Sequence, residues 1–409
     1  MKVFRVPLHW QILISILVAI PIGFFFYEYV PSIKWIGDMF IRSLKMIAIP
    51  IVFSSLVMGV SSLGGYKDLG RLAGKTLSFY LITTLFAAIL GVLLVNIISP
   101  GVGADLNLKQ DIEQLNISKL SFKDQMVGVV PQNIFEELSK GNLLPIIFFA
   151  ILLGFFITKV SQESHNSLNT LFKAFFEVFM KMTLFIVKFT PLGVFAIVSN
   201  IVAEQQADTQ KLVGLMSSLG LYTSVVWLGC FLHSTVTLPA LVYSITKYNP
   251  YKHIKKMSVT LLTAFSTCSS GAALPLAIKD SQEKVGISNK IASFVLPLGS
   301  TINMNGTALY EGVTAIFIAQ AYGIDLSITQ QFLIILTSVV AAIGSAGIPM
   351  AGLVMIAVVL GVVGLPLEGI GLVLAVQQLC DMARSTTNVH GDTCAAVVIA
   401  HTEGEKLNL

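Results

Sequence analysis

Apolar stretches about 20 residues long recur from one end of this chain to the other. A helix of roughly 20 apolar residues is what crosses the hydrocarbon core of a bilayer. Only 12% of the residues are charged and 55% are hydrophobic, whereas about 25% are charged in ordinary soluble domains. The pattern therefore excludes a water-soluble globule and predicts an all-α integral membrane protein without a separate soluble domain.

The first 250 residues contain six apolar stretches that are continuous enough to span a membrane. They lie near 10–29, 37–63, 76–99, 143–158, 171–202 and 212–246. Lysine and arginine gather before the first stretch and then in alternate connections. The later ones are Lys67, Arg71 and Lys75, then Lys159 and Lys173, then Lys247, Lys252, Lys255 and Lys256. This alternation follows the positive-inside rule and predicts a cytoplasmic N-terminus, with the loop from about 101 to 141 outside.

Two later apolar stretches are interrupted by small and polar residues. The first break reads STCSSGAALP over 266–275, and the second, GSAGIP over 344–349, divides a stretch from about 332 to 363. Non-helical backbone is tolerated at membrane depth only where protein buries it or where it lines a watery cavity. The breaks favour two re-entrant hairpins that meet at a transporter site, as in inverted repeats, with two kinked spanning helices as the alternative.

Four polar residues near the C-terminal end form a stripe. Asp381, Arg384, Asn388 and Asp392 are spaced three, four and four residues apart, which places them on one helical face. Arg384 offers a planar fork that matches a carboxylate, and Asp381, one turn away, can pair with an ammonium. The stripe suits an amino acid with an acidic side chain. The alternative is that the two charges only neutralise each other.

Oxygen-bearing side chains near the stripe indicate a coupling cation. Asp392 has no lysine or arginine within one turn on its face, and Asn303 and Asn388 can add amide oxygens, which hard cations prefer. Asn303 and its neighbours weaken the helix around 299–312. In that segment Glu311 is surrounded by apolar residues, and desolvation favours its neutral form, so it can carry a proton. The alternative is a helix-end carboxylate that reaches solvent.

Other function classes find little support in the sequence. The four cysteines, Cys230, Cys268, Cys380 and Cys394, have neither metal-ligand nor redox spacing and are expected to be buried small hydrophobes. His390 is expected to be a bystander. The sequence has no basic stripe interleaved with aromatic residues, so a nucleic-acid partner is not expected. The glycine-rich segment 70–76 is one residue short of the spacing of a phosphate-binding loop. We expect no cofactor, and a passive channel and a membrane enzyme remain as alternative classes.

Four motifs together resemble the glutamate transporter family, the dicarboxylate/amino acid:cation symporters, over nearly the whole chain. They are TCSSGAALP (267–275), INMNGTALYEG (302–312) in place of the family's NMDGT motif, GSAGIPMAG (344–352) and DMARSTTNVHGD (381–392). The resemblance implies eight spanning helices with two re-entrant hairpins, a homotrimer in the plasma membrane and an elevator movement. The resemblance also implies a division of the chain into a transport core, 251–409, and a part that is mainly scaffold, 1–250. The third span (about 76–99) belongs with the core.

The resemblance also implies the substrate and the residues that hold it. The function would be symport of glutamate or aspartate driven by a proton or sodium gradient, with cystine or a C4 dicarboxylate as alternatives. Arg384 would hold the side-chain carboxylate, Asp381 the amino group, and Ser270 with Asn388 the main-chain carboxylate. The full set carried over by position is Ser269, Ser270, Thr307, Ile348, Gly352, Asp381, Arg384, Ser385 and Asn388.

Three sodium sites are implied by the same resemblance. The first would use Gly299, Asn303, Asn388 and Asp392, the second Thr301, Met304 and Ser345, and the third Tyr80, Thr83, Thr84 and Asn303. Asn305 stands where the family has an aspartate, and Gln377 where it often has one. Both departures remove negative charge and predict fewer sodium ions. Glu311 resembles the proton-carrying glutamate of the animal members.

Overall fold

The computed structural model describes residues 8–61, 70–102, 127–128, 130–140, 143–204, 209–344 and 351–409. All regular elements in these ranges are helices, and no strand occurs among them. This confirms the all-α class. Two helical stretches there, Arg71–Ile98 and Val213–Thr246, are long and apolar enough to cross a membrane by length and composition.

The helices of the first 250 residues follow the apolar stretches. They are α1 Leu8–Phe25, η1 Val30–Ile33, α2 Lys34–Ser61, α3 Gly70–Ile98, α5 Ile134–Lys140, α6 Leu143–Ile157, α7 Gln162–Val187, α8 Thr190–Glu204, α9 Thr209–Leu232, η4 His233–Thr237 and α10 Leu238–Thr246. Each expected stretch is helical for most or all of its length. The sixth runs through α9, the π turn η4 and α10. Pro239, the second residue of α10, follows the π turn closely and has no N–H to donate to the helix ladder.

The rest of the chain is made of shorter helices and one long one. They are α11 Pro250–Lys256, α12 Ser258–Thr267, α13 Ser270–Asp280, η5 Ser281–Val285, α14 Asn289–Ile302, α15 Asn305–Ala321, α16 Ile328–Gly344, α17 Ala351–Val363, η6 Leu367–Gly369, α18 Ile370–Leu374 and α19 Gln377–Thr402. The chain therefore breaks between α12 and α13 and between α14 and α15, close to where small and polar residues interrupt the apolar pattern.

The first break is a tight turn between two short helices, α12 and α13. Cys268 ends α12 with φ of 52°, in the left-handed region, and the Ser269 hydroxyl then accepts the N–H of Ala272 at 3.2 Å to cap α13. α12 and α13 pack against each other. The second expected break, 345–350, lies outside the described residues, and the flanking helices α16 and α17 also pack together.

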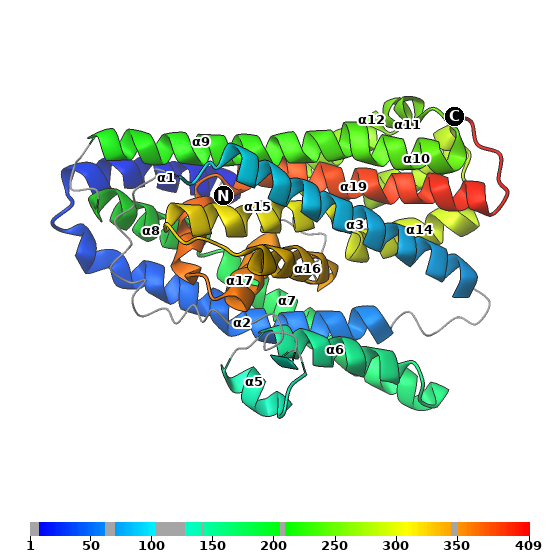
Figure 1. The fold of residues 1–409 in the computed structure, drawn as a ribbon, viewed down its shortest axis with the longest axis horizontal. Helices are drawn as coiled ribbons and strands as arrows, with labels where there is room; N and C mark the ends of the chain where they lie inside the picture. The colour runs from blue at the N-terminus through cyan, green and yellow to red at the C-terminus, as the bar shows by residue number, and fades with distance from the viewer. Residues whose placement is uncertain are drawn as a thin grey trace, which may run out of the picture.

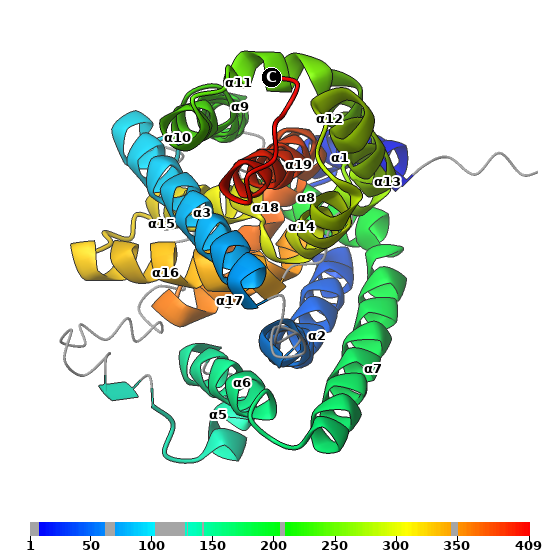
Figure 2. The ribbon, with the colours of Figure 1, turned by 90° about the vertical axis from the view of Figure 1, so that its right-hand side faces the viewer.

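The helices pack in two groups, and α2, α6 and α7 of the first group lie on the opposite side of the molecule from α9 of the second in Figures 1 and 2. In one group α2 packs against α6, α7 and α8, and α1 packs against α8. In the other, α19 packs against α9, α12, α14 and α15, while α3 packs along α15. Between residues 380 and 400 of α19 only Met382 and Thr386 are not buried. A polar helix is thus enclosed by protein.

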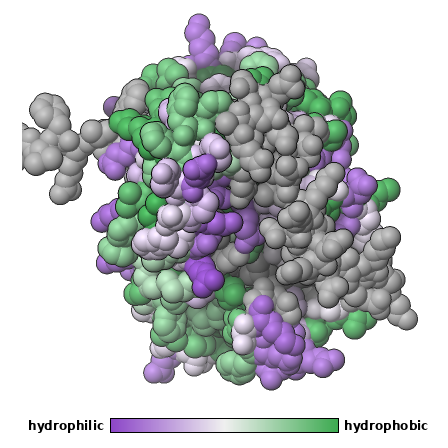
Figure 3. Space-filling model, turned by 90° about the vertical axis from the view of Figure 1, so that its left-hand side faces the viewer, coloured by the Kyte–Doolittle hydropathy of each residue, from purple (hydrophilic) through white to green (hydrophobic). Residues whose placement is uncertain are grey.

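Large apolar side chains remain exposed on the outer helices. Phe25 of α1, Ile97 of α3 and Phe231 of α9 are 72%, 78% and 63% exposed. Figure 3 shows apolar surface between smaller polar patches on one face. Exposure on this scale is costly in water but not where lipid solvates the surface, so it agrees with a membrane protein.

Candidate functional site

One buried face of α19 carries the polar stripe that the spacing predicts. Asp381, Arg384, Asn388 and Asp392 are each at most 3% exposed. Arg384 Nε lies 3.0 Å from Asp381 Oδ1, yet it makes no hydrogen bond to any described residue. The two side chains are therefore paired by charge, and an N–H of the guanidinium is still available to an anion.

Asn388 joins the stripe to the break between α14 and α15. Its side-chain oxygen accepts the backbone N–H groups of Gly306 at 2.8 Å and Thr307 at 3.3 Å, which lie in the first turn of α15. Its amide nitrogen donates to Thr307 Oγ1 at 3.1 Å and contacts Met304 Sδ at 3.2 Å. Asn388 thus satisfies N–H groups that the helix start leaves without partners.

Two glycines let other backbone segments approach Arg384. A Cβ on Gly306 would lie 2.3 Å from the Arg384 carbonyl oxygen, so α15 and α19 can meet this closely only with glycine there. A Cβ on Gly352 would lie 2.7 Å from Arg384 Nη1. The start of α17 is therefore placed against the guanidinium, and Thr307 Oγ1 accepts from the same Nη1 at 3.4 Å.

The serine-rich turn lies near the start of α19. Ser269 and Ser270 are 8% and 3% exposed, and α12 and α13 both pack against α19. Next to these serines, Cys268 Sγ accepts a hydrogen bond from Gln378 Nε2 at 3.1 Å. The turn is therefore within one helical turn of Asp381 along α19.

Three of the four residues predicted for the first cation cluster, Gly299, Asn303 and Asp392, lie together, whereas the side chain of Asn388 is bonded to the start of α15. Asn303 Nδ2 donates to Asp392 Oδ1 at 2.9 Å. A Cβ on Gly299 would lie 2.5 Å from the same oxygen and 2.7 Å from the Tyr80 hydroxyl, so these groups converge on one small volume. Carboxylate, amide and hydroxyl oxygens of this kind suit a hard monovalent or divalent cation.

A second cluster of oxygens lies beside Asn305. Thr84 Oγ1 donates to Asn305 Oδ1 at 2.7 Å, and Thr83 Oγ1 lies 3.4 Å from the side-chain oxygens of both Asn303 and Asn305. Asn305 Nδ2 is buried without a hydrogen-bond partner among the described residues. The amide gives this cluster one acceptor oxygen and no charge where an aspartate would give two oxygens and a negative charge.

Only some of the remaining predicted residues lie at these clusters. Met304 is buried and reaches Asn388, whereas Thr301 is exposed and its hydroxyl donates to the Leu298 carbonyl at 2.9 Å. Ser385 is buried on α19 next to Arg384. The predicted residues Ser345 and Ile348 lie outside the described residues.

Glu311 is fully enclosed in the middle of α15. Its side chain is 0% exposed, and neither carboxylate oxygen has a hydrogen-bond partner in the described part of the chain. The alternative of a helix-end carboxylate that reaches solvent is therefore wrong. An ionised carboxylate without a partner is far more costly to bury than a neutral carboxylic acid.

Comparison with known proteins identifies the family of the chain. The model of the sodium:dicarboxylate symporter family matches residues 8–402, which is nearly the whole chain. The chain belongs to this family. It is therefore a membrane symporter and not an enzyme, which confirms the resemblance found in the four motifs.

Curated relatives of the family cover almost the same length. The chain is 37% identical to the proton/sodium-glutamate symport protein of Bacillus caldotenax, over 98% of the chain and 96% of the relative. It is 34% identical to the proton/glutamate-aspartate symporter of Escherichia coli K12, over 98% and 94%. It is 32% identical to the human neutral amino acid transporter A, over 89% of the chain and 75% of the relative.

Within this symporter the structure adds two residues that the sequence does not assign to the site. Gln377 Nε2 donates to Asp381 Oδ1 at 3.0 Å, and Gln377 Oε1 accepts from the Tyr310 hydroxyl. Tyr310 lies on α15 and is linked to Arg384 through Gln377 and Asp381. The spacing of four residues between Gln377 and Asp381 indicates their contact, but no sequence pattern links either of them to Tyr310.

Proposed function

We propose that this symporter carries glutamate or aspartate by secondary active transport, driven by a proton gradient, a sodium gradient or both. The observation that carries the proposal is the buried Arg384, whose Nε–H has no hydrogen-bond partner in the described ranges although Asp381 lies 3.0 Å away. A guanidinium matches a carboxylate and a carboxylate matches an ammonium, so the pair fits both ends of an acidic amino acid. The names of the bacterial relatives support this substrate class.

The surrounding residues supply the other contacts of the proposed site. Arg384 binds the side-chain carboxylate and Asp381 the amino group, while Ser270 and Asn388 bind the main-chain carboxylate. Thr307 contacts the side chain from α15. The other proposed contacts are Ser269, Ser385, Gly352 and Ile348.

Asp381 distinguishes an amino acid from the other candidate substrates. Its carboxylate repels the second acid group of a C4 dicarboxylate and attracts an ammonium, so the dicarboxylate is disfavoured. Cystine is disfavoured less firmly, because its second half carries a carboxylate that Arg384 could bind together with a second ammonium group. A neutral amino acid, as in the name of the human relative, offers no side-chain carboxylate to the buried Arg384 Nε–H, and a buried donor without a hydrogen bond is costly.

The proposed architecture has eight spanning helices, two re-entrant hairpins formed by α12–α13 and α16–α17, inverted repeats and a homotrimer. Residues 251–409 form the transport core with α3, and most of 1–250 forms the scaffold; the contacts of α9 with α3, α15 and α19 support assigning α9 to the core as well. The core moves as an elevator, with the segment before Gly352 as gate. The N-terminus is cytoplasmic, so a cysteine at the exposed Tyr251 is expected to label only from inside.

The buried side-chain oxygen atoms support two coupling ions, a proton and sodium. Glu311 carries a proton, because its carboxyl is enclosed and has no hydrogen-bond partner among the described residues that would hold it ionised. Sodium binds at Asp392 with Asn303 and Gly299. The cluster beside Thr83 and Thr84 binds sodium more weakly, because Asn305 is neutral. At least one cation must accompany the substrate, since a bound acidic amino acid adds net negative charge to a water-poor site.

Uptake into proteoliposomes tests the proposal. The purified protein is expected to concentrate radiolabelled aspartate or glutamate above the outside concentration when an inward cation gradient is imposed, and to lose this when an ionophore collapses the gradient. Excess unlabelled serine and succinate are added as competitors, to test whether a neutral amino acid or a C4 dicarboxylate displaces the labelled substrate. Uptake that stops at equilibration under every gradient indicates a passive facilitator instead.

Replacing Asn305 with aspartate is expected to increase the sodium dependence of uptake. The new carboxylate adds an oxygen and a negative charge beside Thr83 and Thr84, which favours a bound cation. The activation of uptake by sodium should become steeper, with a Hill coefficient higher by up to about one. The matched control is Asn96→Asp, which places the same change on α3 beside Gln331, outside the cluster. Identical sodium curves for wild type and Asn305→Asp contradict the assignment.

A further inference from the structure

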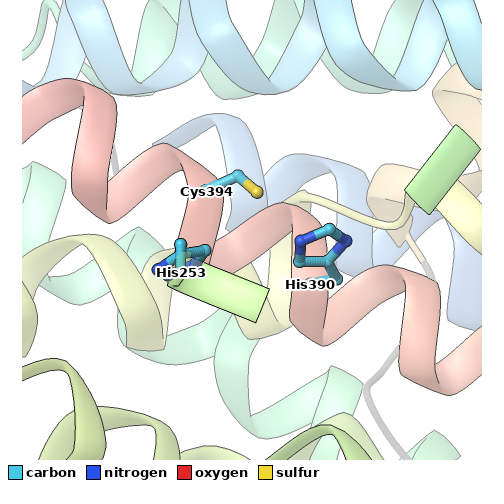
Figure 4. A group of neighbouring side chains, drawn as sticks. All are labelled: His253, His390 and Cys394. Carbon is cyan, nitrogen blue, oxygen red and sulfur yellow. The ribbon is translucent and has the colours of Figure 1, made fainter. Parts of the chain in front are cut away.

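A buried cluster of two histidines and a cysteine lies away from the proposed substrate site. His253 comes from α11, and His390 and Cys394 come from α19, one helical turn apart (Figure 4). They are 0%, 2% and 1% exposed. One ligand atom from each residue lies within 4.8 Å of the others. The side chains are therefore close enough to share one ion after small rotations.

The cluster is on a different face of α19 from the proposed cation site. With 3.6 residues per turn, His390 and Cys394 share one face, whereas Asp392, midway between them, points to the opposite side. Asp392 is turned toward Asn303, which donates to it at 2.9 Å. His390 is turned toward His253, and their rings are nearly parallel, with centroids 6.2 Å apart. The two sets of side chains do not share a ligand.

Both histidines have a ring nitrogen without a partner. His253 Nδ1 and His390 Nε2 are buried and make no hydrogen bond to any described residue. The Thr393 hydroxyl lies 3.0 Å from the His390 carbonyl and 3.1 Å from His253 Nε2. When it donates to the carbonyl, it accepts from His253 Nε2, and in this tautomer Nδ1 keeps a free lone pair. Buried polar atoms without partners are rare in proteins and call for an explanation.

We propose that His253, His390 and Cys394 bind a divalent transition-metal ion, with zinc as the best match. Imidazole nitrogens with a thiolate are a zinc ligand set, and three protein ligands leave one position of the tetrahedron for water. Binding displaces the thiol proton of Cys394 into solution, and the metal then takes the sulfur and nitrogen lone pairs. Thr393 holds His253 from the second shell, as a hydrogen-bonded oxygen does for most metal-bound histidines.

The bound metal joins α11 to α19. α11 leads directly into α12, the first helix of the serine-rich turn, whereas α19 carries the substrate and cation residues. A metal bound by both helices restrains the base of that turn relative to the site. This role is independent of the substrate and coupling ions, so it can be tested without transport.

Cobalt binding to the purified full-length protein in detergent tests this inference. After treatment with a chelator, Co²⁺ is titrated in, because a thiolate bound to Co²⁺ gives a near-ultraviolet charge-transfer band that histidine alone does not give. We expect about one Co²⁺ per chain with this band, displacement by Zn²⁺, and a higher unfolding temperature with Zn²⁺. Cys394→Ser is expected to abolish the band, and His253→Phe to weaken binding by more than about 100-fold.

Two further variants separate this site from other thiols and from general destabilisation. Cys230→Ser removes a buried thiol of α9 that belongs to no such cluster in the described ranges, and the band is expected to persist. Thr393→Val keeps all three ligands and is expected to weaken binding by about 10- to 100-fold. A wild-type protein that elutes as a single species but shows no band, or a band that survives in Cys394→Ser, overturns the inference.

Discussion

Replacing Arg384 with cysteine is expected to abolish the uptake of aspartate and glutamate while uptake of small neutral amino acids such as serine is spared or gained. The cysteine removes the guanidinium that is proposed to bind the side-chain carboxylate, but Asp381 is retained for the ammonium. Truncating one partner of a buried, hydrogen-bonded charge pair costs about 2 to 5 kcal/mol. The affinity for the acidic substrate should therefore fall by roughly 30- to 4,000-fold.

Binding of labelled aspartate and uptake of labelled serine are measured in the same preparation. Transport of serine by Arg384→Cys shows that the variant is folded, so that loss of aspartate binding reports recognition. Arg42→Cys is the matched control, because Arg42 is exposed on α2 and should be replaceable without effect on either substrate. Aspartate affinity within about threefold of wild type in Arg384→Cys means that Arg384 only neutralises Asp381.

The parts of the fold that could be predicted from the sequence depend on local pattern. The apolar stretch that became α3 is long and continuous, so hydropathy alone locates it. The turn at Cys268 is marked by small residues on both sides. The stripe on α19 follows from spacings of three and four residues, because such residues share a helical face. In each case the signal lies within one segment.

The contacts between distant segments could not be predicted in this way. Tyr310 reaches Gln377 because α15 packs against α19, and His253 reaches His390 and Cys394 because the fold brings its side chain close to α19. The spacing of four between His390 and Cys394 is visible in the sequence, but it gives two ligands on one helix and no third. The expectation that the four cysteines are buried is confirmed, whereas the proposed role of Cys394 as a metal ligand depends on the tertiary structure.

Replacing Glu311 with glutamine is expected to remove the response of uptake to a proton gradient while exchange of substrate across the membrane survives. Glutamine has nearly the shape of the neutral acid, so the packing of α15 is retained, but it neither binds nor releases a proton. If one proton accompanies each substrate, a gradient of one pH unit supplies about 1.36 kcal/mol and supports roughly tenfold accumulation without a membrane potential. Glu311→Gln should show no accumulation under that gradient.

Glu403→Gln is the matched control for this experiment. Glu403 follows α19 and is paired with Arg71 and Lys75, each at 2.7 Å, outside the membrane-spanning segments. The hydrogen bond from Lys75 lowers the pKa of Glu403 from its usual value, so this carboxylate stays ionised near neutral pH and does not carry a proton. Its variant should respond to the pH gradient as the wild type does.

The comparison of the two variants decides whether Glu311 carries the coupled proton. Exchange of external label for internal unlabelled aspartate needs no net proton movement, so it measures whether Glu311→Gln still binds and moves substrate. Retained exchange with lost accumulation assigns the proton to Glu311. If wild-type uptake ignores the pH gradient, or if Glu311→Gln accumulates substrate under it as the wild type does, Glu311 is a buried neutral acid that serves packing, and sodium at Asp392 must provide the coupling.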